Sequence, residues 1–329
     1  ANTVPGVVSG WDEAYKMSQK EMGSKYKWAD ILKTPIDYAK NGFPVSTSLN
    51  FWTKVDIDPT DSEFRNLQRF PEFSKVFLKN GTDAYDVGEI LVQPDLANTL
   101  SLIAKKGAKE FYQGEIAKKI EANDGMLSLE DFKNHHADWV EPIHVNYRDT
   151  VAYNFPPNTQ GMASLEILNV LNNFDVKSLG EGTADYYHVI IEATKQAFAD
   201  RDKYLTDPEF SDIPLDYLLS KDHGKDQAKR ISMEEAAIKV EPLDPKGDTI
   251  WLGVVDKDGN AVSLIQSIYH DFGSGIVPKG TGVILQNRGS FFSLDPNHVN
   301  ALMPHKRTFH TLNPAMMLKN GKPYLVYGT

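Results

Sequence analysis

One stretch, residues 247–267, most constrains what this chain can fold into. Two apolar runs of strand length flank an Asp-x-Asp-Gly-Asn turn, which is a strong hairpin signal. If the chain folds about residues 257–260, Thr249 falls opposite Ile268, or opposite Ser267 if the turn carries a one-residue bulge. Either register brings the hydroxyls of Thr249 and Ser267 close together at the open end, because neighbouring cross-strand side chains lie about 4.5–8 Å apart.

Thr and Ser are ordinary strand residues, and most such pairs only hydrogen-bond to each other, so spacing alone does not indicate catalysis. The surrounding sequence adds more. The triplet Gly247-Asp248-Thr249 before a strand, the turn segment 254–262 and the later Phe272-Gly-Ser-Gly-Ile-Val277 resemble the start of the small subunit of the gamma-glutamyltranspeptidases. That family consists of N-terminal-nucleophile hydrolases, in which a precursor cuts itself before a Thr.

The resemblance implies autocleavage between Asp248 and Thr249, with Thr249 as the nucleophile and Ser267 as the hydroxyl residue that supports it. A hydroxyl attacks an amide efficiently only when a base takes its proton, and a free α-amine with a pKa of about 7.7–8.0 can do so near neutral pH. Water or an amine acceptor then resolves the acyl-enzyme. Without cleavage Thr249 has no α-amine, and the site is expected to be inactive.

Five further residues occupy positions that border the substrate in the family: Tyr269, Arg288, Phe291, His310 and Thr311. His310 and Thr311 replace a Ser-Ser pair, and Tyr269 replaces an Asn. Phe291 replaces the acidic residue that holds the glutamyl α-amino group, and a phenyl ring cannot form that salt bridge. Arg288 replaces a Gln and can bind a carboxylate bidentately; a surface ion pair is the alternative, and the substrate-binding role is favoured over it.

The leading interpretation is therefore a gamma-glutamyltransferase-like enzyme of the glutathione hydrolase type. One alternative is a related acylase of the glutaryl or cephalosporin type, which does not use a free γ-glutamyl group; the form Pro156-Pro-Asn-x-Gln-Gly161 looks like that acylase-like branch. A second alternative is an unprocessed, inactive homologue that acts as a scaffold. The implied partners are a small amide or γ-glutamyl substrate, a water or amine acceptor, and a homo-oligomer of processed heterodimers.

The implied fold is α+β, a four-layer αββα N-terminal-nucleophile hydrolase sandwich. Residues 1–248 would be the C-terminal part of the large (alpha) subunit and residues 249–329 the N-terminal part of the small (beta) subunit. Together they would form one domain, incomplete at both ends, because the opening motif 3–11 lies well inside family members. The Gly-Gly pair that supplies oxyanion donors in the family would follow Thr329.

Composition excludes several other functions. The net charge of −10 and the absence of a basic stripe argue against nucleic acid as a partner. No apolar run reaches the roughly 20 residues of a membrane span. The sequence has no Cys, which excludes thiolate catalysis and leaves the compartment undecided, with the cytoplasm slightly favoured. No cofactor and no metal is expected.

The local patterns predict mostly helical structure over residues 1–130, a long helix over 183–204 and a charged, solvated helix over 222–237. Paired strands are expected at 143–147 and 150–154, a strand at 283–289, and a last hairpin around Asn320-Gly321. The loop 155–161 runs into a helix N-terminus, which is either an anion site or a plain connection. Residues 240–247 have the composition of an exposed linker.

Overall fold

The structure is a computed structural model that describes residues 2–124, 126–237 and 248–328. The linker predicted at 240–247 lies outside the described residues. The chain divides into two compact units: Ala1–Asp138 with Ile268–Arg288, and Trp139–Ser267 with Gly289–Thr329. Each unit therefore combines residues that precede Thr249 with residues that follow it.

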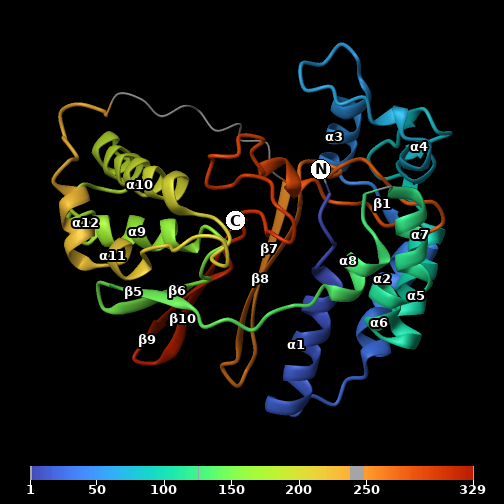
Figure 1. Cartoon of the computed structure of the whole chain (residues 1–329), viewed down its shortest axis with the longest axis horizontal. Coiled ribbons are helices and arrows are strands. Elements are labelled where there is room, and N and C mark those ends of the chain that lie inside the picture. The colour runs from blue at the N-terminus through green and yellow to red at the C-terminus, as the bar shows by residue number, and fades with distance from the viewer. Residues whose placement is uncertain (1, 125, 238–247, 329) are drawn as a thin grey trace. The chain divides into compact units, whose positions relative to one another are not determined.

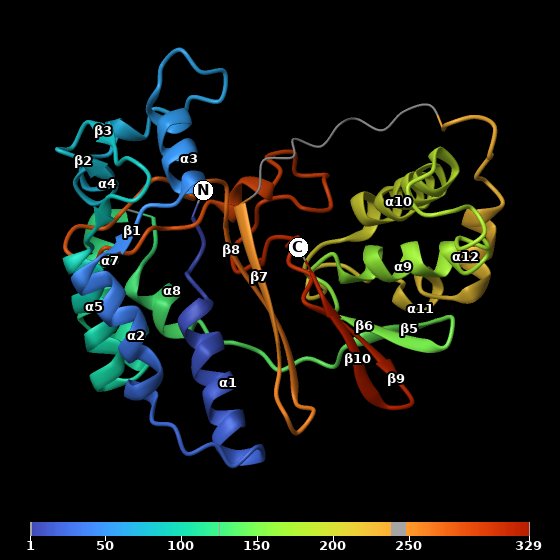
Figure 2. The same ribbon diagram turned by 180° about the vertical axis from the view of Figure 1, so that it is seen from behind.

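The first unit is mostly helical, as the sequence predicts. Its elements are α1 (Val7–Glu21), α2 (Trp28–Asn41), β1 (Phe43–Pro44), α3 (Thr47–Ile57), η1 (Leu67–Arg69), α4 (Pro71–Phe77), β2 (Leu78–Lys79), β3 (Asp83–Ala84), β4 (Ile90–Leu91), α5 (Pro94–Lys106), α6 (Lys109–Gln113), α7 (Glu115–Asp124) and α8 (Leu129–Asn134). Figure 2 shows α2 and α5 side by side, and the two helices pack directly against each other. Phe111, Ile120 and Phe132 are fully or almost fully buried in the core beside them.

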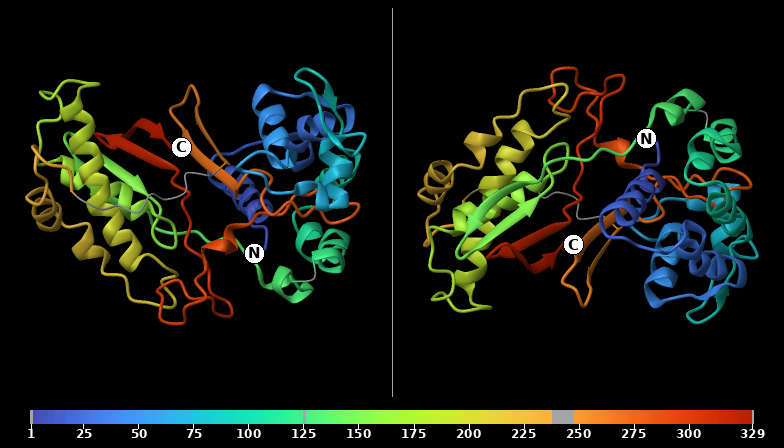
Figure 3. Two further views of the ribbon diagram at one scale, coloured as in Figure 1. Left: turned by 90° about the horizontal axis from the view of Figure 1, so that it is seen from above. Right: turned by 90° about the horizontal axis from the view of Figure 1, so that it is seen from below.

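The second unit is built on an antiparallel sheet. Its elements are β5 (Ile143–Tyr147), β6 (Thr150–Asn154), α9 (Gly161–Leu171), α10 (Ala184–Tyr204), α11 (Leu215–Leu218), α12 (Lys221–Ala228), β7 (Asp248–Val255), β8 (Ala261–Tyr269), η2 (Arg288–Phe291), β9 (Ala315–Lys319) and β10 (Lys322–Tyr327), with β8 and η2 crossing the unit boundary. The strand order β10-β9-β6-β5 joins the two predicted hairpins into one four-stranded sheet (Figure 3). The pairing Ala152↔Met317 fixes the register between them.

Helices cover one face of this sheet. Helix α9 packs on β5 and β6, and α10 and α12 pack against α9 (Figure 1). Leu165 of α9 is fully buried against Val145 and Ala152, whose side chains point to the same face of the β5–β6 hairpin. Burying a Leu side chain of this kind stabilises the fold by about 1.5–3 kcal/mol. The combination of helices and antiparallel sheets is the α+β class expected from the sequence.

Two local predictions are wrong. Residues 283–289 do not form a strand: Leu285 bonds to Ile276 and Ser274, but Gly273 and Gly275 have positive φ and turn the partner segment away from a regular ladder. The predicted solvated helix at 222–237 is α12, which ends at Ala228 and buries one face. Among the described residues no helix combines the length and the apolar character that crossing a bilayer requires.

Candidate active site

The turn between β7 and β8 decides how these strands pair. The carbonyl of Asp256 accepts from Gly259 N at 3.2 Å, and Asp256 N donates to Asn260 O at 3.0 Å. Gly259 has φ +86°, which costs glycine little. The Asp256 carboxylate holds the turn by accepting from the backbone N–H groups of Asp258 and Asn260, each at 2.9 Å. This is a three-residue loop with a glycine bulge.

The bulge sets the register at the far end of the hairpin. Asp256 faces Asn260, so the residue seven positions before Asp256 faces the residue seven positions after Asn260. These two residues are Thr249 and Ser267. Their hydroxyls form a hydrogen bond, with Thr249 Oγ1 donating to Ser267 Oγ at 2.9 Å. Of the two registers that the sequence allows, the one with the bulge is therefore found.

The hydroxyl pair has a defined local environment. Thr249 and Ser267 are both partly buried, and both belong to the second unit. In the continuous chain Thr249 N is a peptide amide that follows Asp248, the first residue of β7. Because the Thr249 proton is directed at Ser267, the lone pairs of Thr249 Oγ1 remain for attack on a carbonyl carbon.

A second set of residues holds the segment that carries His310. His310 N donates to Asn158 O, and Gln160 N donates to His310 O, each at 2.8 Å. The Asn158 side chain donates to Thr308 O at 2.6 Å. The loop 155–161 and the segment that carries His310 are therefore bound together, with one parallel bridge between Thr159 and His310.

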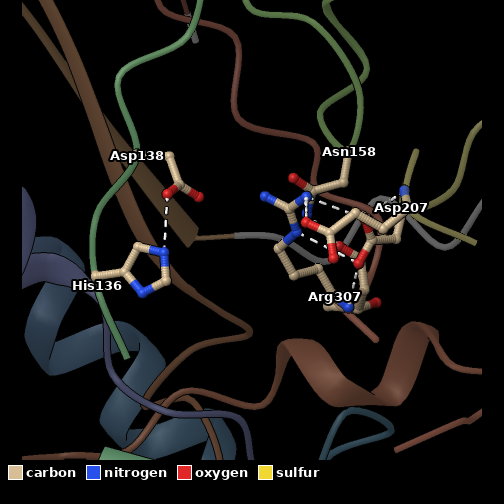
Figure 4. A network of polar contacts seen from close by, with 7 residues as sticks. His136, Asp138, Asn158, Asp207 and Arg307 are labelled. Atoms are coloured by element: carbon tan, nitrogen blue, oxygen red, sulfur yellow. Dashed lines mark hydrogen bonds and ion pairs between the residues drawn. The ribbon is translucent and has the colours of Figure 1, made fainter. Parts of the chain in front are cut away.

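Asp207 anchors the same segment from the other side. Its carboxylate is almost completely buried and accepts from Arg307 N at 2.8 Å and from the Arg307 guanidinium at 3.0 Å. Figure 4 shows the Arg307 guanidinium turned toward this carboxylate. Burial raises the pKa of Asp207, but the hydrogen bonds from Arg307 and from the Glu209 backbone N–H outweigh it and hold this pKa below its ordinary value. Asp207 therefore stays ionised and keeps Arg307 in place.

Phe291 lies in an aromatic contact. Its ring meets that of Phe309 edge to face, with centroids 4.7 Å apart. Phe309 belongs to a buried hydrophobic cluster with Met162 and Leu218, and Phe291 packs against this cluster. Thr311, the last of the predicted residues in this unit, is partly buried and follows His310 directly. Phe291 thus has a packing role of its own, which the sequence alone does not show.

Tyr269 and Arg288 lie together in the first unit. The Arg288 guanidinium carbon sits 4.1 Å from the centroid of the Tyr269 ring, a cation–π contact. Arg288 is only 2% exposed, and its burial lowers the pKa of the guanidinium to about 10, so the group remains charged at neutral pH. The interpretation of Arg288 as a surface ion pair is therefore wrong.

Sequence reasoning missed Asp207 and the side chain of Asn158. Asp207 is separated by a hundred residues from Arg307, and nothing local marks its carboxylate as buried. The only available signal for Asn158 was its place between two prolines and a helix start, which indicates a rigid loop but not its partner.

A threonine at the start of a strand, supported by a cross-strand hydroxyl in an α+β fold, is the arrangement expected of an N-terminal-nucleophile hydrolase. The family model for gamma-glutamyltranspeptidase matches residues 1–329. The chain belongs to the gamma-glutamyltranspeptidase family.

Individual relatives agree with this assignment. The chain is 45% identical over its whole length to the glutathione hydrolase-like YwrD proenzyme of Bacillus subtilis, and 40% identical to the oxamate amidohydrolase proenzyme of Klebsiella pneumoniae; it covers 61% of each. The crystal structure of cephalosporin acylase from Bacillus halodurans matches 99% of the chain with a TM-score of 0.86 and 39% identity, and the match covers 59% of that protein. The chain thus spans about three fifths of the length of these relatives and has the predicted N-terminal-nucleophile hydrolase fold.

Proposed function

We propose that the protein cleaves itself between Asp248 and Thr249 and then hydrolyses or transfers the acyl group of a small amide through a Thr249 acyl-enzyme. The observation that carries this proposal is the hydrogen bond of 2.9 Å between Thr249 Oγ1 and Ser267 Oγ. On this proposal residues 1–248 belong to the large subunit and residues 249–329 to the small subunit.

The first step uses Thr249 against its own chain. Its hydroxyl oxygen attacks the carbonyl carbon of Asp248, the C–N bond to Thr249 breaks, and the released nitrogen takes up a proton to become an amine. Water then hydrolyses the resulting ester, which leaves a carboxylate on Asp248 and a free α-amine and hydroxyl on Thr249. Ser267 accepts the hydroxyl hydrogen bond and so orients the attacking oxygen.

The second step reuses the same oxygen on the substrate. The free α-amine of Thr249 takes the hydroxyl proton, the oxygen attacks the amide carbonyl, and the amine of the substrate leaves with a proton. The ester is resolved by water, which gives hydrolysis, or by an amine acceptor, which gives transfer. Residues of the hairpin supply both the nucleophile and its orienting partner.

The nature of the acyl group distinguishes two candidate activities. A gamma-glutamyltransferase-like activity follows from the family and from relatives named for glutathione. A glutaryl- or cephalosporin-type acylase is favoured by Phe291, which packs on Phe309 and offers no charge to a free glutamyl amino group. Arg288, buried and charged, suits a carboxylate on the substrate in either case.

Two measurements test the reaction itself. The intact mass of the purified full-length protein, with N-terminal sequencing, shows whether a new chain begins at Thr249. We expect two chains for the natural protein and for Thr249→Ser, and one unprocessed chain for Thr249→Ala. A single chain in fully active natural protein, or processed and active Thr249→Ala, contradicts the proposal; a single inactive chain supports the scaffold interpretation.

A pair of chromogenic substrates separates the two activities. The ratio of kcat/KM for γ-glutamyl-anilide to kcat/KM for glutaryl-anilide compares acyl groups that differ only in the α-amino group. A ratio above one supports the gamma-glutamyltransferase-like activity, and a ratio below one supports the acylase. Because both substrates need Thr249, the Thr249→Ala variant serves as the blank for each.

A further inference from the structure

A buried polar cluster in the second unit joins three helices. Glu166 comes from α9, Asp200 from α10, and His223 from α12. One ligand-type atom from each residue lies within 4.8 Å of the other two. Gln227, four residues after His223 and so on the same face of α12, adds another buried polar side chain.

The close approach of α12 to α9 has a local cause. A Cβ atom on Gly224 would lie 2.8 Å from the Cβ of Asn169 on α9, a distance that atoms cannot adopt without moving. Gly224 therefore allows the two helix backbones to come together. The neighbouring His223 is brought into the interior beside Glu166 because of this contact.

The hydrogen bonds within the cluster satisfy Asp200 but not Glu166. Asp200 Oδ2 accepts from Gln227 Nε2 at 2.8 Å and lies 2.7 Å from His223 Nε2. The side chain of Glu166 is completely buried, and neither of its carboxyl oxygens has a hydrogen-bond partner among the described residues; Gln227 Oε1 also has none. Buried polar groups left in this state destabilise a fold, unless a ligand satisfies them.

We propose that Glu166, Asp200 and His223 bind a divalent transition-metal ion of the zinc class, with Gln227 Oε1 available as a further oxygen ligand. A cation placed between the side chains would satisfy the two unpaired Glu166 oxygens and neutralise two adjacent carboxylates. Burial and the charge of Asp200 raise the pKa of Glu166 to about 9.

The donor set and its dimensions fit this class of ion. One imidazole nitrogen with carboxylate oxygens suits Zn²⁺, whereas Mg²⁺ and Ca²⁺ favour oxygen ligands alone. In a tetrahedral site, ligand atoms at about 2.0–2.2 Å from the ion lie about 3.3–3.6 Å apart. The three ligand atoms all lie within 4.8 Å of one another, so they need to approach one another by up to about 1.5 Å on binding.

The position of the cluster indicates a structural role. Its residues tie α9, the helix that lies on the sheet, to α10 and α12. The Asp200 side chain retains 19% exposure, so an ion has a route from solvent to the cluster. The sequence did not suggest this site, because its residues are widely separated along the chain and no local spacing marks them.

The test is Zn²⁺ binding by the full-length protein after dialysis against EDTA. Isothermal titration and metal analysis should show one Zn²⁺ per protein molecule, and a hundredfold excess of Zn²⁺ over Kd should raise Tm by about 2–4 °C. Ca²⁺ and Mg²⁺ at the same concentration should not. Anomalous diffraction at the zinc edge should place the ion between Glu166 and His223.

Two variants and a control make the test specific. Glu166→Gln and His223→Gln should each weaken Zn²⁺ binding by at least about tenfold, and circular dichroism in EDTA verifies that each is folded. His136→Gln removes an exposed His that pairs with Asp138 at 3.1 Å (Figure 4), and it should bind Zn²⁺ like the natural protein. The proposal is overturned if no Zn²⁺ binds at one per protein molecule, if both cluster variants bind it normally, or if the ion is found elsewhere.

Discussion

Removing the Ser267 hydroxyl tests the role of the hairpin pair most directly. In the Ser267→Ala variant Thr249 Oγ1 loses its acceptor at 2.9 Å while the nucleophile itself is kept. One neutral hydrogen bond contributes about 0.5–1.5 kcal/mol. Because about 1.36 kcal/mol corresponds to a tenfold change in rate, we expect self-cleavage and kcat each to slow by about twofold to about thirteenfold.

The same strand provides a matched control. Ser263 of β8 accepts a hydrogen bond from Trp251 Nε1, also at 2.9 Å. This hydrogen bond does not involve Thr249. Ser263→Ala therefore removes an equivalent hydroxyl contact between the same two strands, together with a longer hydrogen bond of 3.4 Å from Ser263 Oγ to Tyr327 O. It should lower Tm about as much as Ser267→Ala does, and it should leave cleavage and kcat near their natural values.

The assay follows the disappearance of the uncleaved chain by mass spectrometry and, on the processed protein, the release of an anilide. Ser267→Thr should restore both rates in part because it keeps a hydroxyl at this position. Equal slowing by Ser263→Ala and Ser267→Ala would show that the hydroxyl acts only through the stability of the hairpin. Natural rates in Ser267→Ala would remove Ser267 from the reaction altogether.

Three further predictions concern specificity, pH and the segment that carries His310. Phe291→Asp should shift the ratio of kcat/KM values toward γ-glutamyl-anilide. Because Phe291 packs on Phe309, the same substitution should lower the free energy of unfolding by about 2–4 kcal/mol in denaturant titration. An unchanged ratio would show that Phe291 takes no part in substrate recognition. Because the pKa of Glu166 is raised, the folded metal-free protein holds a proton that the unfolded chain loses. The contribution of Glu166 to the free energy of unfolding is therefore full below about pH 4.5 and is lost as pH rises through about 9, by on the order of 1 kcal/mol per pH unit. Glu166→Gln should flatten this pH dependence in EDTA, and a natural protein whose stability already shows no such dependence contradicts the prediction. Asp207→Asn should lower the free energy of unfolding by about 1–2 kcal/mol, because Arg307 loses charge-assisted hydrogen bonds. The loss stays this small because Arg307 is itself partly exposed. No loss in denaturant titration would mean that the contact is not stabilising.

Local sequence determined the hairpins of this protein. The turn residues around Gly259 and around Asn320-Gly321 adopt positive φ where the sequence places glycine and asparagine. The periodicity of apolar residues and the conformational preferences of turn residues act over a few residues, so hairpins can be predicted before the fold is known. The register that pairs Thr249 with Ser267 was reduced to two choices, and only the observed bulge decided between them.

The sequence by itself also determined the family and the nucleophile candidate, because short motifs around Thr249 carry both. Tertiary structure alone decided what depends on contacts between distant segments. It showed that Phe291 packs on Phe309, that Arg288 is buried against Tyr269, and that Asp207 fixes Arg307. The burial and electrostatic environment of a side chain depend on the whole packed chain. A local sequence pattern therefore does not identify the distant residue that a given side chain will contact.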